Sequence, residues 1–254
     1  VLSVEDGLSL KKAADERGLK VGSAPDTFLG GAHQQAREII DSGKLGKIMS
    51  GTTHVMSRGM EHWHPNPDFF FQPGGGPVLD IGPYYITNLV QLLGPVKRVA
   101  ALASTPASER TITSKPRYGE KIRVATPTTI HALLEFENGA TITFNASWDV
   151  WKHGHAPIEL YGEEGTIFVP DPNFFGGDLL FTNRVDPVKK LPKWDHAFSV
   201  PNQQHTQGMM ANYRASGLAD MALVTSMRLS VQPVTDDEWV EVCRMGGLVP
   251  APKA

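Results

Sequence analysis

Residues 128–148, TTIHALLEFENGATITFNASW, predict a β-hairpin and with it a sheet that has one buried face. The dipeptide Asn138-Gly139 is typical of a two-residue type I′ turn, because both central residues of that turn need positive φ. Apolar residues alternate with polar ones on either side of it. The expected core face carries Ile130, Ala132, Leu134, Phe136, Ala140, Ile142, Phe144, Ala146 and Trp148. The opposite face, rich in Thr, His, Asn and Ser, is polar enough to meet water, a ligand or a partner subunit.

Further elements follow on both sides of this hairpin. A second hairpin is expected to join residues 158–161 to 166–169 through Glu163-Glu164-Gly165. Ser3 and Asp6 have near capping-box spacing and predict a helix to about Arg17, followed by a short buried strand at 19–23. Two more helices are expected at about 31–42 and 80–93, the latter closed by Gly94-Pro95. Residues 170–205 are expected to be loop-rich, and a last helix is expected to start near Gln207.

Composition excludes several classes of partner. The chain has 254 residues, is 41% hydrophobic and carries a formal charge of −3, so nothing points to nucleic acid or to an anionic membrane. No run reaches the roughly 18 apolar residues of a membrane span, and the first residues lack signal-peptide features. Cys243 is the single cysteine, which fits a reducing compartment. The expected location is cytoplasmic.

The stretch GGGPVLDIGPYY at residues 74–85 is the strongest candidate for chemistry. Its glycines would deliver Asp80 to the first turn of a helix, with Tyr84 at i+4 on the same helical face. A carboxylate and a phenol in this arrangement can orient a substrate hydroxyl and move its proton. Spacing alone leaves a structural alternative open, in which Asp80 is an N-cap and Tyr84 belongs to the core.

Several motifs resemble the glucose-fructose oxidoreductase, inositol dehydrogenase and rhizopine-catabolism (Gfo/Idh/MocA) oxidoreductases. They are the run at 74–85, Leu-Leu-Gly-Pro-Val at 92–96, Glu-Asn-Gly-Ala at 137–140 and Tyr-Gly-Glu-Glu-Gly-Thr at 161–166. Residues 24–30 and 217–222 are similar too, so that the resemblance covers about residues 1–225.

This resemblance implies an α/β protein with an open, mostly antiparallel sheet covered by helices on one face. Residues 1–29 would be a remnant of a dinucleotide-binding Rossmann domain, and residues 30–254 an α/β domain for substrate binding and oligomerisation. It also implies NAD or NADP in the intact enzyme, a sugar or polyol substrate, catalytic roles for Asp80 and Tyr84, and a homodimer or homotetramer formed through the exposed sheet face.

The sequence departs from the family in three places. The Gly-x-Gly-x-x-Gly fingerprint after a buried strand is absent, so no cofactor-binding residue is assigned and the chain alone is expected to bind no dinucleotide. The family's catalytic lysine would align just before Val1. Tyr84 stands where many members have His, and a tyrosine at this place resembles the glucose-fructose oxidoreductase branch. The sequence after Met221 no longer follows the family.

The histidines supply the remaining candidates. By the family's layout, His62, Trp63 and His64 could lie near a polyol substrate, although an ordinary surface loop would explain them equally well. His33 could line the site or the surface. His153, His155 and Glu159 are spaced like a cupin metal motif without its companion, so no metal is assigned. The sequence therefore predicts an oxidoreductase, with a non-catalytic oligomerising or sugar-binding fragment as the alternative and a cupin-like metal enzyme third.

Overall fold

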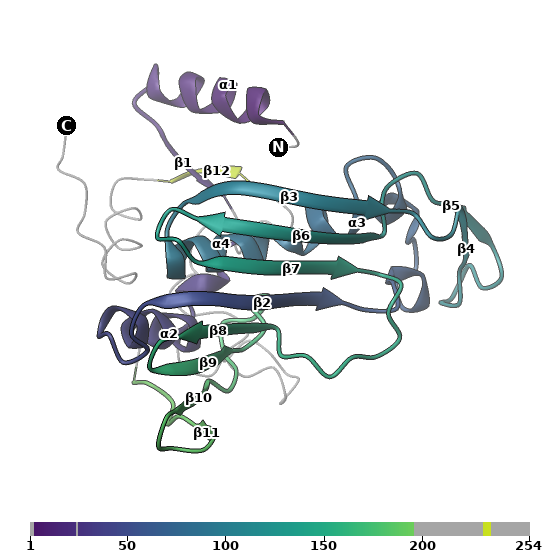
Figure 1. Cartoon of the computed structure of the whole chain (residues 1–254). Coiled ribbons are helices and arrows are strands. Elements are labelled where there is room, and N and C mark those ends of the chain that lie inside the picture. The colour runs from purple at the N-terminus through teal and green to yellow at the C-terminus, as the bar shows by residue number, and fades with distance from the viewer. Residues whose placement is uncertain (1–2, 24, 196–230, 235–254) are drawn as a thin grey trace. The chain divides into compact units, whose positions relative to one another are not determined.

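The computed structural model describes residues 3–23, 25–195 and 231–234, and these contain a large mixed sheet with helices against one of its faces (Figure 1). The chain divides into two compact units. One comprises residues 1–34, 174–176 and 193–254, and the other comprises residues 35–173 and 177–192. The helix expected near Gln207 lies outside the described residues.

The larger unit is built on an eight-stranded sheet with the order β11-β10-β9-β8-β2-β7-β6-β3. Only the β2–β7 pair is parallel, so the sheet is mostly antiparallel, as expected. The strands are β2 (Ile48–Met56), β3 (Val96–Ser104), β6 (Thr129–Phe136), β7 (Thr141–Ser147), β8 (Ile158–Gly162), β9 (Gly165–Val169), β10 (Leu180–Asn183) and β11 (Lys189–Lys190). Strands β4 (Glu109–Thr111) and β5 (Lys121–Arg123) form a separate antiparallel ribbon.

Both predicted hairpins are confirmed, but the first has a different turn. In β6–β7 the N–H of Gly139 bonds the carbonyl of Phe136, and the N–H of Phe136 bonds the carbonyl of Ala140. The loop therefore has three residues, 137–139, with Gly139 at a φ of 91°. This is the pattern of a type I turn followed by a glycine bulge, which needs positive φ only at the glycine. The expected two-residue type I′ turn is wrong.

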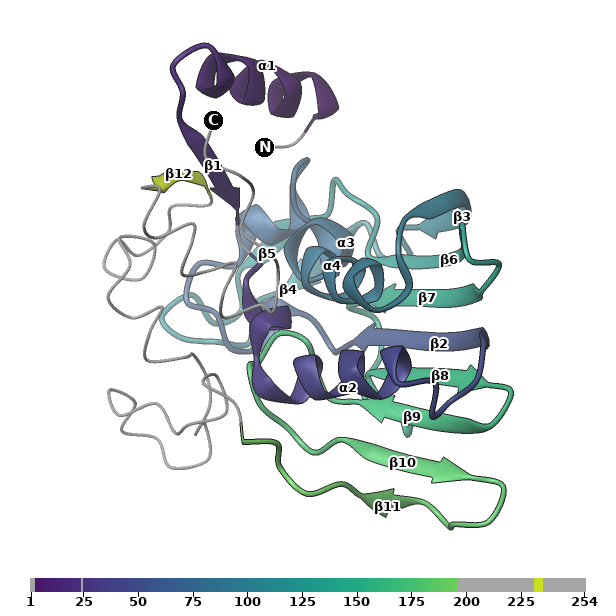
Figure 2. The ribbon, with the colours of Figure 1, turned by 90° about the vertical axis from the view of Figure 1, so that its left-hand side faces the viewer.

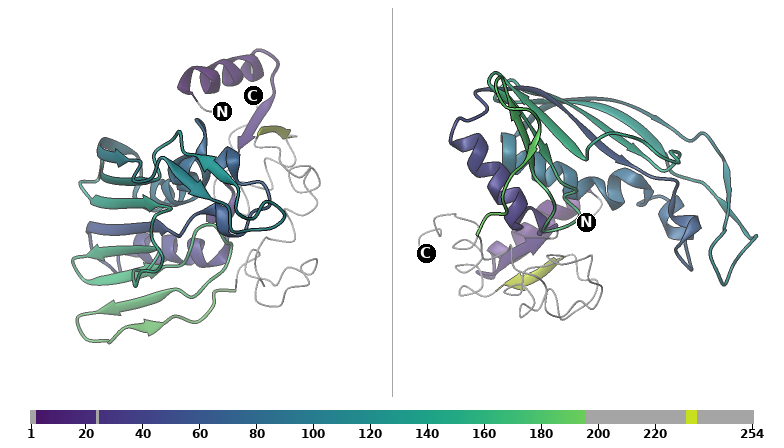
Figure 3. Two further views of the ribbon diagram at one scale, coloured as in Figure 1. Left: turned by 90° about the vertical axis from the view of Figure 1, so that its right-hand side faces the viewer. Right: turned by 90° about the horizontal axis from the view of Figure 1, so that it is seen from below.

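The helices cover one face of the sheet (Figures 2 and 3). They are α2 (Gly31–Asp41), α3 (Gly76–Asp80) and α4 (Gly82–Leu93). The larger unit also contains the short 3-10 helices η2 (Met60–His62) and η3 (Asp68–Phe71), and the smaller unit contains η1 (Thr27–Leu29). Their apolar sides meet the predicted core face, where Leu89, Phe136 and Phe144 are buried in one cluster. The described residues place no helix on the opposite face, which carries the polar alternation of β6 and β7.

A second buried cluster lies around the β4–β5 ribbon. It joins Phe71 of η3, Ile112, Ile122 and Trp148, the last residue of the predicted core alternation, with three further residues, Met60, Phe70 and Val124. Because Met60 opens η2, this cluster anchors the loop that follows β2 and the side chains that it presents.

The smaller unit contains α1 (Val4–Asp15) and strand β1 (Lys20–Ser23), which pairs antiparallel with β12 (Val231–Val234). The Ser3 side chain accepts the Asp6 N–H, so the predicted N-cap is confirmed. The strand at 19–23 was expected to be buried, and this is wrong, because Leu19 and Val21 are both more than 40% exposed. A short run of apolar residues does not by itself distinguish a buried strand from an exposed one.

Candidate functional site

Asp80 and Tyr84 do not lie on one helix. Asp80 is the last residue of α3, and α4 begins at Gly82, with Ile81 at the junction. The prediction of a single helix from Asp80 is wrong, and Asp80 is not an N-cap, since Ile81 holds that position. Pro83 has no N–H to continue the hydrogen-bond ladder, and this breaks the helix between the two residues.

The carboxyl group of Asp80 is half-buried and has no hydrogen-bond or ion-pair partner among the described residues. Burial raises its pKa, because desolvation disfavours the charged form. Tyr84 packs against the main core cluster with part of its surface exposed. A half-buried acid with an elevated pKa is a suitable proton acceptor near neutral pH.

The neighbouring tyrosine forms a separate buried pair. The hydroxyl of Tyr85 donates to Oδ1 of Asp171 at 3.0 Å, and the same oxygen accepts the N–H of Asn173. Burial raises the pKa of both Tyr85 and Asp171. A hollow of about 270 Å³ lies beside this pair and is lined in part by Ile81, Met60 and Trp148.

His33 is fully buried on the first turn of α2. Its Nε2 lies 2.8 Å from the carbonyl oxygen of Phe174, so this nitrogen carries the proton and donates. Burial lowers its pKa to about 4. His33 is therefore a neutral histidine bonded to a backbone carbonyl.

His62 lies in a pocket of about 390 Å³ whose lining does not include Asp80, Tyr84 or His33. Its Nδ1 is 2.7 Å from an Arg58 nitrogen and 2.6 Å from the Thr113 hydroxyl. Its Nε2 is 3.3 Å from Oε1 of Glu61. The pocket is lined by Arg58, Glu61, His62, Ala107, Glu109, Arg110, Thr111, Thr113, Trp148, Asp149 and Trp151.

The other two aromatic candidates lie outside this lining. Trp63 is 64% exposed and meets the ring of His64 edge to face. His64 also packs edge-on against Phe69 and Phe70, and its Nδ1 accepts the Asn66 N–H. The structure thus places His64 in an aromatic cluster and brings only His62 into the pocket.

The histidines of the cupin-like pattern form a third group. His153 and His155 precede β8, and the ring of His155 stacks on that of His54 at 4.0 Å. Burial, followed by the neighbouring imidazoles, lowers the pKa of His54 to about 4. Within residues 3–23, 25–195 and 231–234, no group of three His, Cys, Asp or Glu residues has the geometry to hold a metal ion.

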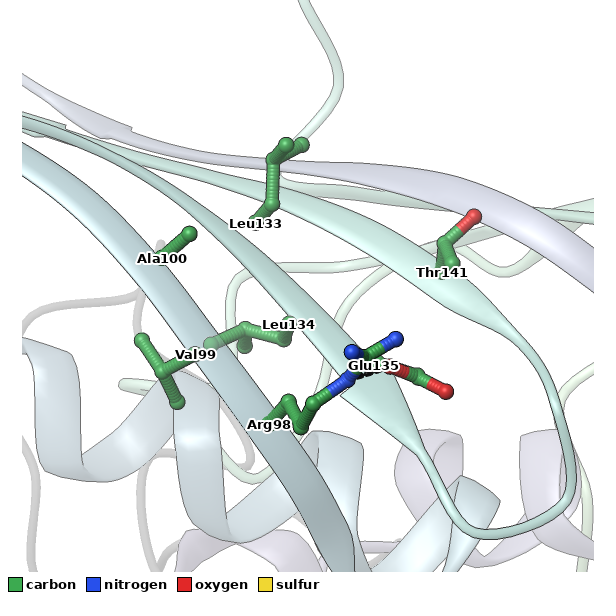
Figure 4. Close-up of a pocket in the computed structure, with 7 residues that line it drawn as sticks. All are labelled: Arg98, Val99, Ala100, Leu133, Leu134, Glu135 and Thr141. Carbon is green, nitrogen blue, oxygen red and sulfur yellow. Dashed lines mark hydrogen bonds and ion pairs between the residues drawn. The ribbon is translucent and has the colours of Figure 1, made fainter.

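A shallow hollow of about 550 Å³ lies at the β3 edge of the open sheet face (Figure 4). Arg98 of β3 and Glu135 of β6 form an ion pair across it. Leu133 on the same face is more than half exposed. Charged and apolar groups side by side at a sheet edge suit contact with a protein surface better than enclosure of a small molecule.

Sequence reasoning did not find Arg58, Arg110, Asp149 or Trp151. Arg58 follows β2 and Asp149 follows β7, and these strands are parallel, so their carboxyl ends meet at one edge. That pairing was not predictable, because the strand at 48–56 has no regular alternation of polar and apolar residues. Arg110 comes from a ribbon about 50 residues along the chain from Arg58.

Comparison with known proteins assigns most of the larger unit to a known domain family. A family model described as the GFO/IDH/MocA C-terminal domain matches residues 33–168. Among curated proteins, none matches this sequence.

Solved structures with the same fold include three oxidoreductases. The first is an NAD binding oxidoreductase from Klebsiella pneumoniae, 21% identical over 75% of this chain and 52% of that one, with a TM-score of 0.62. The second is an aldose-aldose oxidoreductase from Caulobacter crescentus complexed with glycerol, 21% identical over 76% of this chain and 53% of that one, with a TM-score of 0.57. The third is the WlbA dehydrogenase from Bordetella pertussis in complex with NADH and UDP-GlcNAcA, 21% identical over 77% of this chain and 51% of that one, with a TM-score of 0.54. The chain spans about half the length of each of them.

Proposed function

Because this chain belongs to the GFO/IDH/MocA family, we propose that it is the substrate-binding and oligomerising part of a nicotinamide-dependent oxidoreductase that acts on a sugar or polyol hydroxyl. The observation that carries the proposal is the half-buried Asp80 carboxyl, which has no partner among the described residues and an elevated pKa. The solved relatives support the substrate class, since their names or ligands include an aldose, glycerol and a nucleotide sugar.

The residues present do not fit a dinucleotide. The sequence has no Gly-x-Gly-x-x-Gly run, and among the residues that the structure describes β1 pairs only with β12, in the antiparallel sense. We therefore assign the nicotinamide site to a part of the enzyme outside these 254 residues. No step at the dinucleotide is assigned to this chain.

The chain's own contribution is to hold the substrate hydroxyl and to accept its proton. Asp80 would accept a hydrogen bond from that hydroxyl, and the phenol of Tyr84 would orient it. Burial favours the neutral form of Asp80, so that the carboxylate binds a proton more readily than an exposed one would. Asp80 ends α3 and Tyr84 lies in the first turn of α4, and the two helices meet at Ile81.

The test is steady-state kinetics on the enzyme that contains this chain together with its dinucleotide-binding part. Asp80→Asn removes the proton acceptor at almost constant size, and Tyr84→Phe removes one hydroxyl. Each should lower kcat by about 10²-fold or more, the usual contribution of an acid–base group. Asp178→Asn, which breaks an exposed ion pair with Lys190, is the control. Unchanged turnover in both variants would show that Asp80 and Tyr84 have only a structural role.

A second function, a non-catalytic sugar-binding or oligomerising protein, is favoured by the missing fingerprint. Both proposals expect the 254-residue chain to bind NADH and NADPH no more tightly than about millimolar. Calorimetric titration measures this directly. Micromolar binding would exclude the non-catalytic alternative and would place the dinucleotide site within this chain.

A further inference from the structure

We infer that the pocket around Arg58 and Trp151 is a second ligand site, and that its ligand is a monosaccharide carrying one carboxylate. The pocket of about 390 Å³ has room for a single sugar ring and is lined without Asp80 or Tyr84. Its existence does not depend on the proposed oxidoreductase reaction.

A buried network forms the wall of the pocket. Arg110 pairs with Oε1 of Glu61 at 2.7 Å and with Asp149 through its other terminal nitrogen. Asp149 also accepts the hydroxyls of Thr128 and Thr129 at 2.8 and 2.6 Å. Glu61 is 2% exposed, so the network holds its charges in fixed positions before any ligand arrives.

This wall leaves buried hydrogen-bonding capacity unused. Within the part of the chain that the structure describes, neither Oε2 of Glu61 nor Nε of Arg110 has a hydrogen-bond partner. An unsatisfied buried polar atom costs about 1–3 kcal/mol. Both atoms are shielded from solvent, so a sugar hydroxyl reaches them only if the wall of the pocket shifts.

The mouth of the pocket carries a cation without an anion. Arg58 is exposed and has no carboxylate within 4 Å among the described residues. Its guanidinium lies 4.4 Å from the centre of the Trp151 ring, which is 74% exposed. A guanidinium held in place by an indole is preorganised for bidentate binding of a carboxylate, and the free edge of the indole suits the C–H face of a sugar.

The pairing of charges in the lining leaves Arg58 without an anion. Arg110 is paired with both Glu61 and Asp149. Glu109, also in the lining, is neutralised by Lys121. A neutral sugar would leave Arg58 unpaired, whereas a phosphate dianion would add excess negative charge beside two carboxylates. A single carboxylate at the mouth, beside the exposed Arg58 and the exposed Trp151 ring, matches the groups present.

The experiment is calorimetric titration of the 254-residue chain with D-glucuronate, D-glucose and D-glucose 6-phosphate. D-glucuronate should bind with a submillimolar Kd, and at least tenfold more tightly than the other two. Arg58→Gln should weaken its binding by tenfold or more. Arg98→Gln, which breaks an ion pair on the open sheet face, should leave the Kd unchanged.

Trp151→Leu provides a second variant at an exposed position, and a melting curve on each variant verifies that it is folded. It should also weaken glucuronate binding, by severalfold. Absence of saturable binding, equal affinity for D-glucose, tighter binding of the phosphate, or full affinity in folded Arg58→Gln would each overturn the inference. None of these readouts involves a nicotinamide, so they leave the proposed reaction untouched.

Discussion

Gly59 is the residue on which the Arg110–Glu61 contact depends. Its φ is 102°, and a Cβ atom there would lie 2.3 Å from Oε2 of Glu61 and 3.0 Å from Nη1 of Arg110. Gly59→Ala should therefore combine backbone strain with displacement of a buried ion pair, and lower the free energy of unfolding by about 3 kcal/mol or more. Urea denaturation measures the change.

Gly119→Ala is the matched control for this substitution. Gly119 has a similar φ of 88°, but a Cβ atom there would meet nothing within 4 Å. Backbone strain alone should lower the free energy of unfolding of Gly119→Ala by about 1 kcal/mol. If the two alanine variants were equally stable, the contact assigned to Gly59 would be wrong.

His33 makes stability depend on pH. Its pKa is about 4 in the folded chain, against an ordinary value of 6.5, so between these values the unfolded chain binds the extra proton. The stabilisation is therefore complete above pH 6.5 and is lost as the pH falls toward 4. His33→Gln keeps a donor and does not titrate. Between pH 7 and 4 the wild type should lose more stability than the variant, by on the order of 3 kcal/mol.

Guanidinium denaturation at a series of pH values tests this difference. His131→Gln, at an exposed histidine that bonds Asn145, serves as the control and should follow the wild type. If the free energy of unfolding changed with pH in the same way in the wild type and in His33→Gln, burial of the His33 ring would not control the pH dependence of stability.

At the scale of elements, the β6–β7 turn fastens the hairpin to α4. The Asn138 side chain donates to the carbonyl of Leu93 at 3.0 Å and accepts the N–H of Ala140 at 2.9 Å. Asn138→Ala should lower the free energy of unfolding by about 1–2 kcal/mol, since two local hydrogen bonds are lost. Glu137→Ala, at the exposed neighbour, should be nearly neutral. A thermal melt in which both variants matched the wild type would contradict this role.

At the scale of the molecule, we propose that copies assemble through the open face and the β3 edge. Leu102 and Leu133 are each more than half exposed on the open face, and Val99, which pairs with Leu134 and points to the other face, is more than half exposed at the β3 edge. Light scattering at tens of micromolar should give a dimer or tetramer. Leu133→Lys should shift it toward monomer, because it places a charge in the contact, whereas Val185→Lys in the β10–β11 loop should not. A monomeric wild type would contradict the proposal.

Among the residues that the structure describes, no helix is long and apolar enough to cross a bilayer.

The sequence by itself determined those helices and strands whose polar and apolar residues alternate or repeat at a regular spacing. The two hairpins, the Ser3 cap, the helix at residues 31–41 and the core face of β6 and β7 agree with the prediction, because period and capping depend on neighbours in the sequence. The family, too, was identified from short motifs.

Tertiary structure decided what depends on residues far apart in the chain. The parallel β2–β7 pairing, the meeting of Arg58 with Trp151, and the pairing of Glu61 with Arg110 join segments about 50 to 90 residues apart, and no local pattern encodes them. Likewise, the burial of His33 and the break between Asp80 and Tyr84 follow from packing around α2 and from hydrogen bonding around Pro83. Side-chain chemistry can be read from the sequence, but the environment that sets a pKa or builds a pocket exists only in the fold.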